Sequence, residues 1–228
     1  MRKDFISTGI TKVFVLLMTL VSLPLIVRAL GEESYGSYVL ILGGVNLIIG
    51  VSNLGLGYGA MRKLPSSIGK VGRGQVFYPQ FYANILIAVA IFCLVIILEN
   101  LTPLGIHLHQ YGISMWLIAI YLLIFPLYAQ LDLLFTFSEN FPYLNILHIS
   151  LTSSFLLLLF LIFNSWTPSV NDIFIAHVVS VLFSIGLLGY KGIQLVGFKF
   201  VFFTKSSFLF DVRHGIPIVM TTITQHVT

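Results

Sequence analysis

The chain alternates long apolar runs with short polar segments. A helix needs about 20 apolar residues to cross the hydrocarbon core of a bilayer, and six runs are of this kind. They cover residues 13–30, 35–61, 81–98, 113–135, 144–163 and 173–190. The runs are continuously apolar rather than alternating, which argues against a transmembrane barrel. The pattern predicts an all-α membrane protein, a bundle of six transmembrane helices.

The last part of the chain differs from the six runs. Residues 191–214 mix lysine and arginine with many phenylalanines, a composition that suits a segment lying in the membrane interface. A further apolar run begins at Gly215, but the sequence ends at Thr228, before a span is complete. We therefore expect three parts: a six-helix bundle at 1–190, a cytoplasmic interfacial linker at 191–214, and the truncated start of a seventh helix and second bundle at 215–228.

Composition agrees with the membrane class. The chain is 57% hydrophobic and only 9% charged, whereas a soluble domain carries about 25% charged residues. The single cysteine, Cys93, lies inside an apolar run, so neither a disulfide framework nor a CxxC metal site is expected. The net charge of +4 comes from basic residues beside the spans, which is typical of orientation signals and not of a nucleic-acid surface.

The basic residues predict the orientation of the chain in the membrane. Eleven of the 12 Lys and Arg residues lie before the first span, between the second and third, or after the sixth. These segments fall on one side if each run crosses once, and cytoplasmic loops are the ones enriched in Lys and Arg. We expect a cytoplasmic N-terminus, with Arg28 alone on the outer side.

The first two runs form a predicted helical hairpin. The expected turn is short and acidic, Gly31 to Ser34. Two prolines, Pro24 and Pro126, are expected to bend the first and fourth spans. Glycines in the second span predict close helix packing; these are Gly43, Gly44, Gly50, Gly55, Gly57 and Gly59.

Four charged residues are the candidate site residues. Arg28, Arg62 and Lys63 are candidates for contact with phosphate or pyrophosphate, and Asp132 is a candidate for binding a coupling cation or proton. The alternatives stay open. Arg28 would instead reach the interface or pair with Glu32 or Glu33, Arg62 and Lys63 would only signal orientation, and Asp132 would simply lie at the interface.

Other polar residues on or beside the spans are expected to form hydrogen bonds between helices; they are Asn46, Asn53, Asn84, Asn145, His148 and His177. His107 and His109 form an HxH with no acidic or cysteine partner nearby, so we expect no metal. The glycine-rich loop at Gly69 lacks the P-loop pattern, so we expect no nucleotide and no cofactor. The sequence holds no motif that points to an enzyme.

The hairpin carries a family resemblance. The turn LGEESYGSY (residues 30–38), the segment SNLGLGYGAMRK (52–63) and the basic link followed by Gly-Ile-Pro (215–217) resemble the bacterial O-antigen and polysaccharide flippases (Wzx-type). These belong to the multidrug/oligosaccharidyl-lipid/polysaccharide exporter superfamily. The resemblance implies a fold of two six-helix lobes around a central cavity, of which this chain would supply the N-terminal half.

The resemblance also implies a function. Such proteins flip undecaprenyl-pyrophosphate-linked oligosaccharides across the bacterial inner membrane for polysaccharide or O-antigen synthesis. Lipid-linked oligosaccharide and membrane lipids would be the partners, with a polysaccharide polymerase or the missing C-terminal half as further ones. Three alternatives remain: a multidrug-type cation-coupled exporter of the same fold, a polyprenyl-lipid transferase, and a non-functional fragment.

Overall fold

The computed structural model describes residues 2–52, 69–101, 114–165 and 168–197. Within these ranges the chain forms five helices: α1 (Arg2–Ser52), α3 (Gly69–Leu101), α5 (Met115–Phe137), α6 (Phe141–Ser165) and α7 (Val170–Val196). All five are long and apolar enough to cross a membrane. The all-helical prediction is confirmed, but the expected number of helices is not, because the first two predicted spans join in α1.

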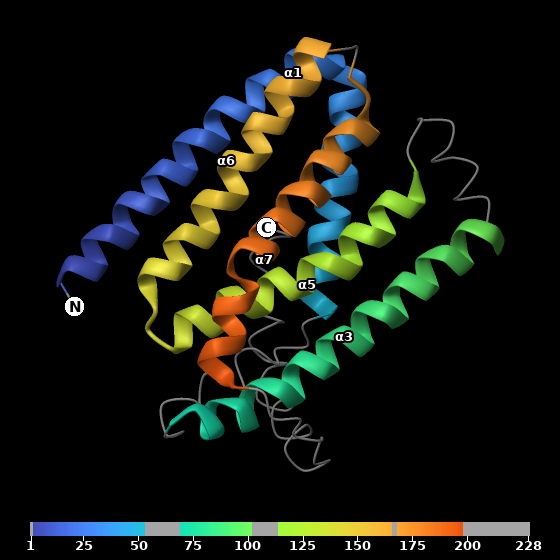
Figure 1. Ribbon diagram of the computed structural model, residues 1–228. Coiled ribbons are helices and arrows are strands. Elements are labelled where there is room, and N and C mark those ends of the chain that lie inside the picture. Colours follow the sequence, from blue (N-terminus) through green and yellow to red (C-terminus); the bar gives the residue numbers. More distant parts are fainter. Residues whose placement is uncertain (1, 53–68, 102–113, 166–167, 198–228) are drawn as a thin grey trace.

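Helix α1 contains the predicted hairpin in a modified form. It is 51 residues long, and Gly31 within it has non-helical angles, φ 75° and ψ 168°. Figure 1 shows the blue helix rising from the N-terminus, turning at its far end and returning through the bundle. The acidic turn expected at Gly31 to Ser34 is thus shorter than predicted. Glycine alone adopts a positive φ without strain, so one residue suffices for the break.

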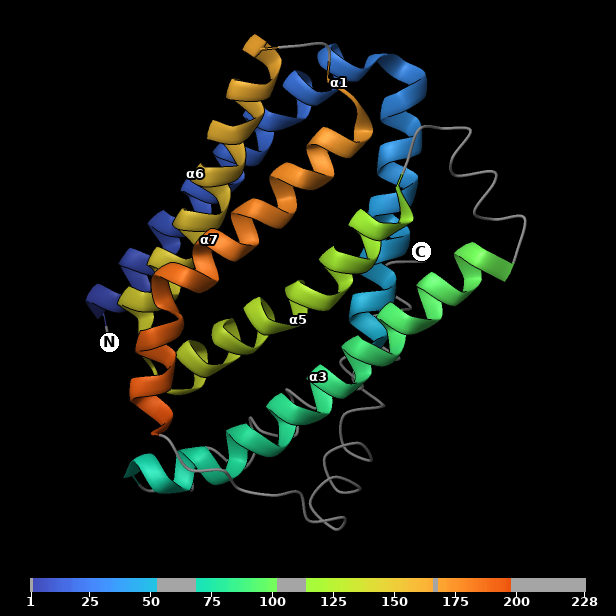
Figure 2. The same cartoon turned by 45° about the vertical axis from the view of Figure 1, so that its right-hand side comes forward.

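The helices pack in the order α3, α5, α7, α6 and α1, each against the next. The returning part of α1 lies beside α5 and α7, as the rotated view also shows (Figure 2). The N-terminus, the beginning of α3, the α5–α6 turn and the end of α7 lie at one end of the bundle, and the break at Gly31 lies at the other (Figures 1 and 2). The connections from α5 to α6 and from α6 to α7 are short, which favours an antiparallel arrangement of each pair.

Two helices extend beyond the predicted spans. A loop from Arg62 to Pro79 is expected between the second and third predicted spans, but α3 already begins at Gly69 and contains Pro79. Gly74 explains part of this, because a Cβ there would lie 3.1 Å from the carbonyl oxygen of Val196 on α7. Helix α7 continues through Lys191 to Val196, past the expected start of the linker, and ends at Gly197 with φ 75°. Glycine and proline in a sequence predict a loop, but here they allow packing within a helix.

Helix α7 begins at a capping box. The Ser169 hydroxyl accepts from the backbone N–H of Asp172, and the Asp172 carboxylate accepts from the backbone N–H of Ser169. Two of the unpaired N–H groups at the start of the helix are satisfied in this way. The cap fixes where α7 starts and therefore which of its residues face α5.

The core is mainly apolar but contains several buried polar side chains, and other large apolar side chains face outward. The buried polar residues are Thr11, Ser22, Gln80, Asn84, Gln130, Asn145, Ser180 and Ser184. Leu40, Leu86, Phe160 and Phe183 are more than half exposed. This distribution suits a bundle surrounded by lipid, in which polar groups bond to one another between helices.

The glycines of the second predicted span do not pack closely where they are described. Nothing lies within 4 Å of a Cβ built at Gly43, Gly44 or Gly50. The close glycine contact is instead on α7, where a Cβ at Gly192 would lie 2.6 Å from Cδ2 of Leu131. Outside the described residues lie Gly55, Gly57 and Gly59, the HxH segment, most of the expected linker, and the start of the seventh helix.

Candidate functional site

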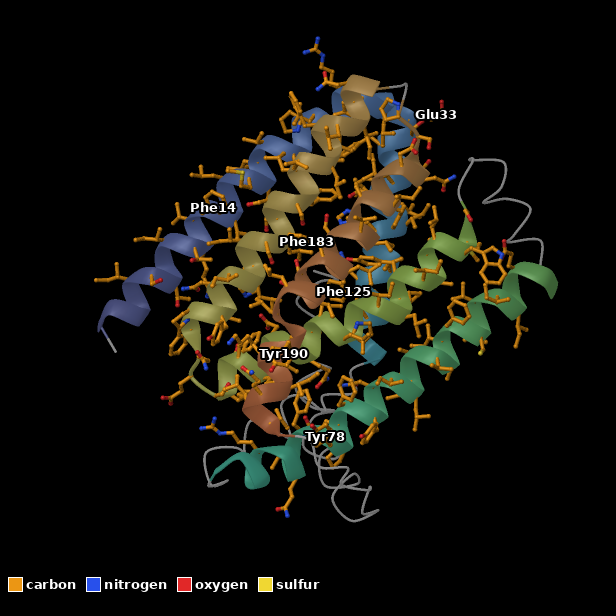
Figure 3. The ribbon with its side chains drawn as sticks, viewed as in Figure 1. Phe14, Glu33, Tyr78, Phe125, Phe183 and Tyr190 are labelled. Atoms are coloured by element: carbon orange, nitrogen blue, oxygen red, sulfur yellow. The ribbon has the colours of Figure 1, made fainter. Side chains whose placement is uncertain are left out.

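One face of α5 carries a line of aromatic and acidic side chains. Tyr121, Phe125, Tyr128 and Asp132 recur at steps of four, three and four residues, which places them on the same side of a helix. The ring centroids of Tyr121 and Phe125 are 5.4 Å apart, and those of Phe125 and Tyr128 are 5.7 Å apart. Figure 3 shows Phe125 near the centre of the bundle. This face links two polar clusters, one toward each end.

The first cluster is built on His177 of α7. Its Nε2 lies 2.8 Å from the hydroxyl of Tyr38 on the returning part of α1. Phe155 of α6 stacks on the imidazole with centroids 4.0 Å apart, and Tyr121 meets it edge-on at 5.8 Å. Four stretches of helix thus meet around one imidazole, so the expected interhelical role of His177 is confirmed.

A cavity of about 330 Å³ opens beside this cluster. Its polar lining comes from Thr19, Ser22, Tyr35, Tyr38, Tyr121, Thr152 and His177, and its apolar lining from Met18, Leu23, Ile26, Val39, Leu42, Leu151, Phe155 and Val181. The volume is at the lower end of the range of ~300–1,000 Å³ found for small-molecule sites. None of the described residues that line it is Asp, Glu, Lys or Arg.

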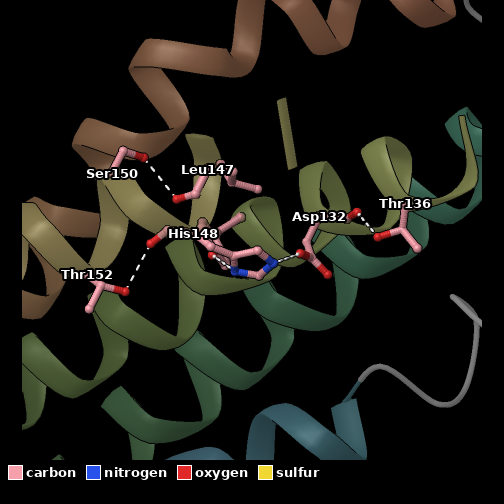
Figure 4. Close-up of polar contacts among 7 residues, drawn as sticks. Asp132, Thr136, Leu147, His148, Ser150 and Thr152 are labelled. Carbon is pink, nitrogen blue, oxygen red and sulfur yellow. Dashed lines mark hydrogen bonds and ion pairs between the residues drawn. The ribbon is translucent and has the colours of Figure 1, made fainter. Parts of the chain in front are cut away.

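The second cluster joins α5 and α6 near the opposite end of the bundle. His148 Nε2 lies 3.0 Å from a carboxylate oxygen of Asp132, and His148 Nδ1 lies 3.2 Å from the Tyr128 hydroxyl. The side chains of His148 and Asp132 are 39% and 32% exposed. Figure 4 shows the ion pair, with Thr136 bonded to the Asp132 carbonyl and Thr152 to the His148 carbonyl.

The structure separates the two predicted site residues that it describes, Arg28 and Asp132. Arg28 is exposed near the Gly31 break and is not among the residues that line the cavity. Among the described residues, no ion pair links it to Glu32 or Glu33, and Glu33 lies at the bundle end (Figure 3). Arg62 and Lys63 lie outside the described residues. Asp132 is the predicted residue that the structure places in a polar cluster.

Sequence reasoning singled out Asp132 and noted His148, but it did not pair them, and it did not consider Tyr38, Tyr121 or Tyr128. The spacing along α5 was a usable signal, because Tyr121, Tyr128 and Asp132 fit one helical face. The Tyr38–His177 bond gave no such signal, since it joins residues 139 positions apart.

Buried amides occupy the contact between α3 and α5. Asn84 and Gln130 line a small cavity of about 110 Å³, and among the described residues their NH₂ groups have no hydrogen-bond partner. Asn84 therefore does not make the expected bond between helices. Asn145 does, since it donates to the Ser7 hydroxyl on α1 at 2.9 Å. Asn46 is exposed.

A separate cavity of about 370 Å³ lies between α3, α5 and α7. Aromatic rings of α3 and aliphatic side chains of α5 and α7 line it, among them Phe77, Phe81, Leu131 and Ile193. Its lining is almost wholly apolar, unlike that of the cavity beside His177. Within the described residues, no three His, Cys, Asp or Glu side chains gather as a metal site would require.

The helices, whose largely apolar core holds a few polar clusters, define a helical membrane protein. The family described as "Polysaccharide biosynthesis protein" matches residues 1–228, and the chain belongs to this family. Proteins of this family are generally transporters or flippases. Comparison with curated proteins and with solved structures gives no match.

Proposed function

We propose that the protein flips a lipid-linked oligosaccharide, carried on undecaprenyl pyrophosphate, across the bacterial inner membrane. The observation that carries this proposal is the family membership over residues 1–228. A bundle cavity that presents hydroxyl and imidazole groups within a mainly apolar lining supports transport, because a saccharide crossing lipid must exchange water for other hydrogen-bonding groups. The chain would act as the N-terminal lobe of a two-lobe exporter, with its N-terminus in the cytoplasm.

We propose further that Asp132 and His148 bind the coupling cation, a proton or a sodium ion. A carboxylate at membrane depth is costly unless paired, and such groups are often functional. The contact at 3.0 Å supplies the pair, and the partial exposure supplies access. Tyr128 orients the imidazole through its other nitrogen.

The three basic candidate residues are proposed to bind phosphate groups at the membrane surface. Arg28 is exposed near the Gly31 break in α1, so we propose that it contacts the pyrophosphate or lipid phosphates there. Arg62 and Lys63 are proposed to make the same kind of contact at the cytoplasmic face. The absence of charged residues from the cavity lining argues against placing the pyrophosphate beside His177.

Deleting the gene from the organism that encodes the chain tests the proposal. Lipid-linked oligosaccharide should accumulate in the cytoplasmic leaflet, and surface polysaccharide should be lost. Reintroducing the gene should restore both. If surface polysaccharide and the lipid-linked pool were unchanged by the deletion, the proposal would be wrong.

A further inference from the structure

We infer that the contact between α3 and α5 holds a small cluster of internal water, with the side-chain amides of Asn84 and Gln130 as its ligands. The site is the cavity of about 110 Å³ that these two side chains line. Water bound there bridges the two helices beside Pro126, where α5 lacks one of its own hydrogen bonds. Such a site is independent of the substrate that the protein carries.

The two amides are buried without partners. Asn84 is 3% exposed and Gln130 is 2% exposed, and among the described residues neither NH₂ group has a hydrogen-bond acceptor. Buried polar groups in native proteins nearly always bond to protein atoms or to ordered water. Water in the cavity between the two side chains is a partner that both amides can share.

A third amide lies on the same side of α3. Gln80 precedes Asn84 by four residues, which places both on one helix face. Gln80 is 4% exposed, and within the described part of the chain its NH₂ group also lacks a partner. Between α1 and α6 the buried Asn145 bonds directly to Ser7. The amides of the α3–α5 contact make no such direct bond, so they need a further component.

Pro126 adds a backbone acceptor to this contact. Proline has no N–H, so the carbonyl of Leu122, four residues earlier, loses its usual partner in the helix. A helical carbonyl points toward the residue four positions later, and Pro126 lines the cavity. Ordered water is one of the groups that satisfy a carbonyl freed by proline in a membrane helix.

The size and the charge of the cavity fit water. A water molecule takes up about 30 Å³ and a buried one makes about three hydrogen bonds, so the cavity holds roughly three molecules. Amide groups both donate and accept, as water does. None of the described residues that line the cavity is charged, so a bare cation would lack an opposite charge there.

The apolar cavity of about 370 Å³ between α3, α5 and α7 is an internal comparison. The two cavities share Phe81 and Leu127 in their walls, but no amide side chain is among the described residues that line the larger one. Apolar cavities stay dry, so we expect water in the smaller cavity alone. Of the two cavities, Leu123 lines the one with the amides and Leu131 lines the apolar one, and both leucines lie on α5.

X-ray radiolytic labelling of the protein in lipid nanodiscs tests for this water. Hydroxyl radicals form from bound water and oxidise the nearest side chains, which mass spectrometry then locates. The test variant combines Asn84→Leu with Gln130→Met, which removes both amides and keeps side chains of similar size. Asn46→Leu is the matched control, because Asn46 is an exposed amide on α1.

We expect Leu123 to be oxidised severalfold faster than Leu131 in the wild-type protein. The double variant should stay folded, because replacing both unpaired amides by apolar groups is nearly neutral, and its thermal unfolding checks this. Its rate at Leu123 should fall to that of Leu131, whereas Asn46→Leu should change neither rate. Equal oxidation of the two leucines in the wild type, or fast oxidation of Leu123 in the folded double variant, would overturn the inference.

A high-resolution structure of the wild-type protein gives a second measurement, which does not depend on the folding of any variant. Density for water should lie about 2.7–3.2 Å from both Asn84 and Gln130. A direct bond between the two amides, a lipid chain in the cavity, or an empty cavity would each contradict the assigned water site.

Discussion

Two histidines of the bundle each pair with a tyrosine from another helix. Tyr38 reaches His177 from α1, and Tyr128 reaches His148 from α5. The two differ in their further partner, since His148 meets the carboxylate of Asp132 and His177 meets the ring of Phe155. The cluster at His148 therefore contains a carboxylate, whereas the described residues that line the cavity beside His177 carry no carboxylate, lysine or arginine.

Asp132→Asn should abolish coupling while leaving the fold intact. The ion pair is about one-third exposed, and exposed pairs contribute only about 0–1 kcal/mol to stability, so thermal unfolding should shift little. Transport driven by a proton or sodium gradient in vesicles should fall to the rate without a gradient. Glu139→Gln is the matched control, since Glu139 is an exposed carboxylate in the α5–α6 turn. Gradient-driven transport by Asp132→Asn at the wild-type rate would remove Asp132 from the mechanism.

The break in α1 depends on a single residue. Gly31 has φ 75°, and an L side chain in such a backbone region costs about 1–3 kcal/mol. Gly31→Ala should therefore lower the free energy of unfolding in detergent by about that amount. Gly36→Ala, in the helical part of α1 with nothing near its Cβ, should have no such effect. Equal stability of the two variants would contradict the assigned break.

The packing of α5 against α7 depends on Gly192. A Cβ there would lie 2.6 Å from Leu131 and 3.4 Å from Leu134. Gly192→Val should separate the helices and destabilise the protein by about 1–3 kcal/mol, as overpacking does. Gly186→Val on the same helix meets nothing within 4 Å and serves as the control. Urea or thermal unfolding of both variants would show whether the two glycines differ as expected.

At the scale of elements, the apolar runs predict the helices well and their ends poorly. Six runs of sufficient length were enough to predict a helical bundle, because an apolar run long enough to cross a bilayer is typical of a membrane helix. Glycine and proline at residues 69–79 predicted a loop, but α3 includes them, since Gly74 lets the backbone of α7 approach. Helix packing can thus override the low helix propensity of glycine and proline.

At the scale of the whole molecule, the pairings between helices were not predictable. Tyr38 and His177 meet only because α1 turns back at Gly31 and α7 begins at its capping box. Asp132 was identified because a carboxylate in an apolar run is costly. Its partner could not be identified, because nothing local to Asp132 indicates which residue of α6 faces it.

The orientation of the molecule is testable with single cysteines. Cys93 is the only cysteine, so a Cys93→Ser background permits new ones. Ser138→Cys lies at the bundle end shared with the N-terminus, and Glu32→Cys lies beside the break at the other end. If the N-terminus is cytoplasmic, an impermeant maleimide added to whole cells with permeable outer membranes should label position 32 and not 138. The reverse pattern would invert the orientation.

Transport in purified vesicles tests the central claim most directly. The protein is reconstituted with an undecaprenyl-pyrophosphate oligosaccharide that carries a fluorescent sugar, and dithionite bleaches the outer leaflet. The account predicts that wild-type vesicles lose nearly all fluorescence as the lipid exchanges leaflets, whereas protein-free vesicles lose about half. Fluorescence that stays at the protein-free level, with the protein folded and inserted, would contradict it.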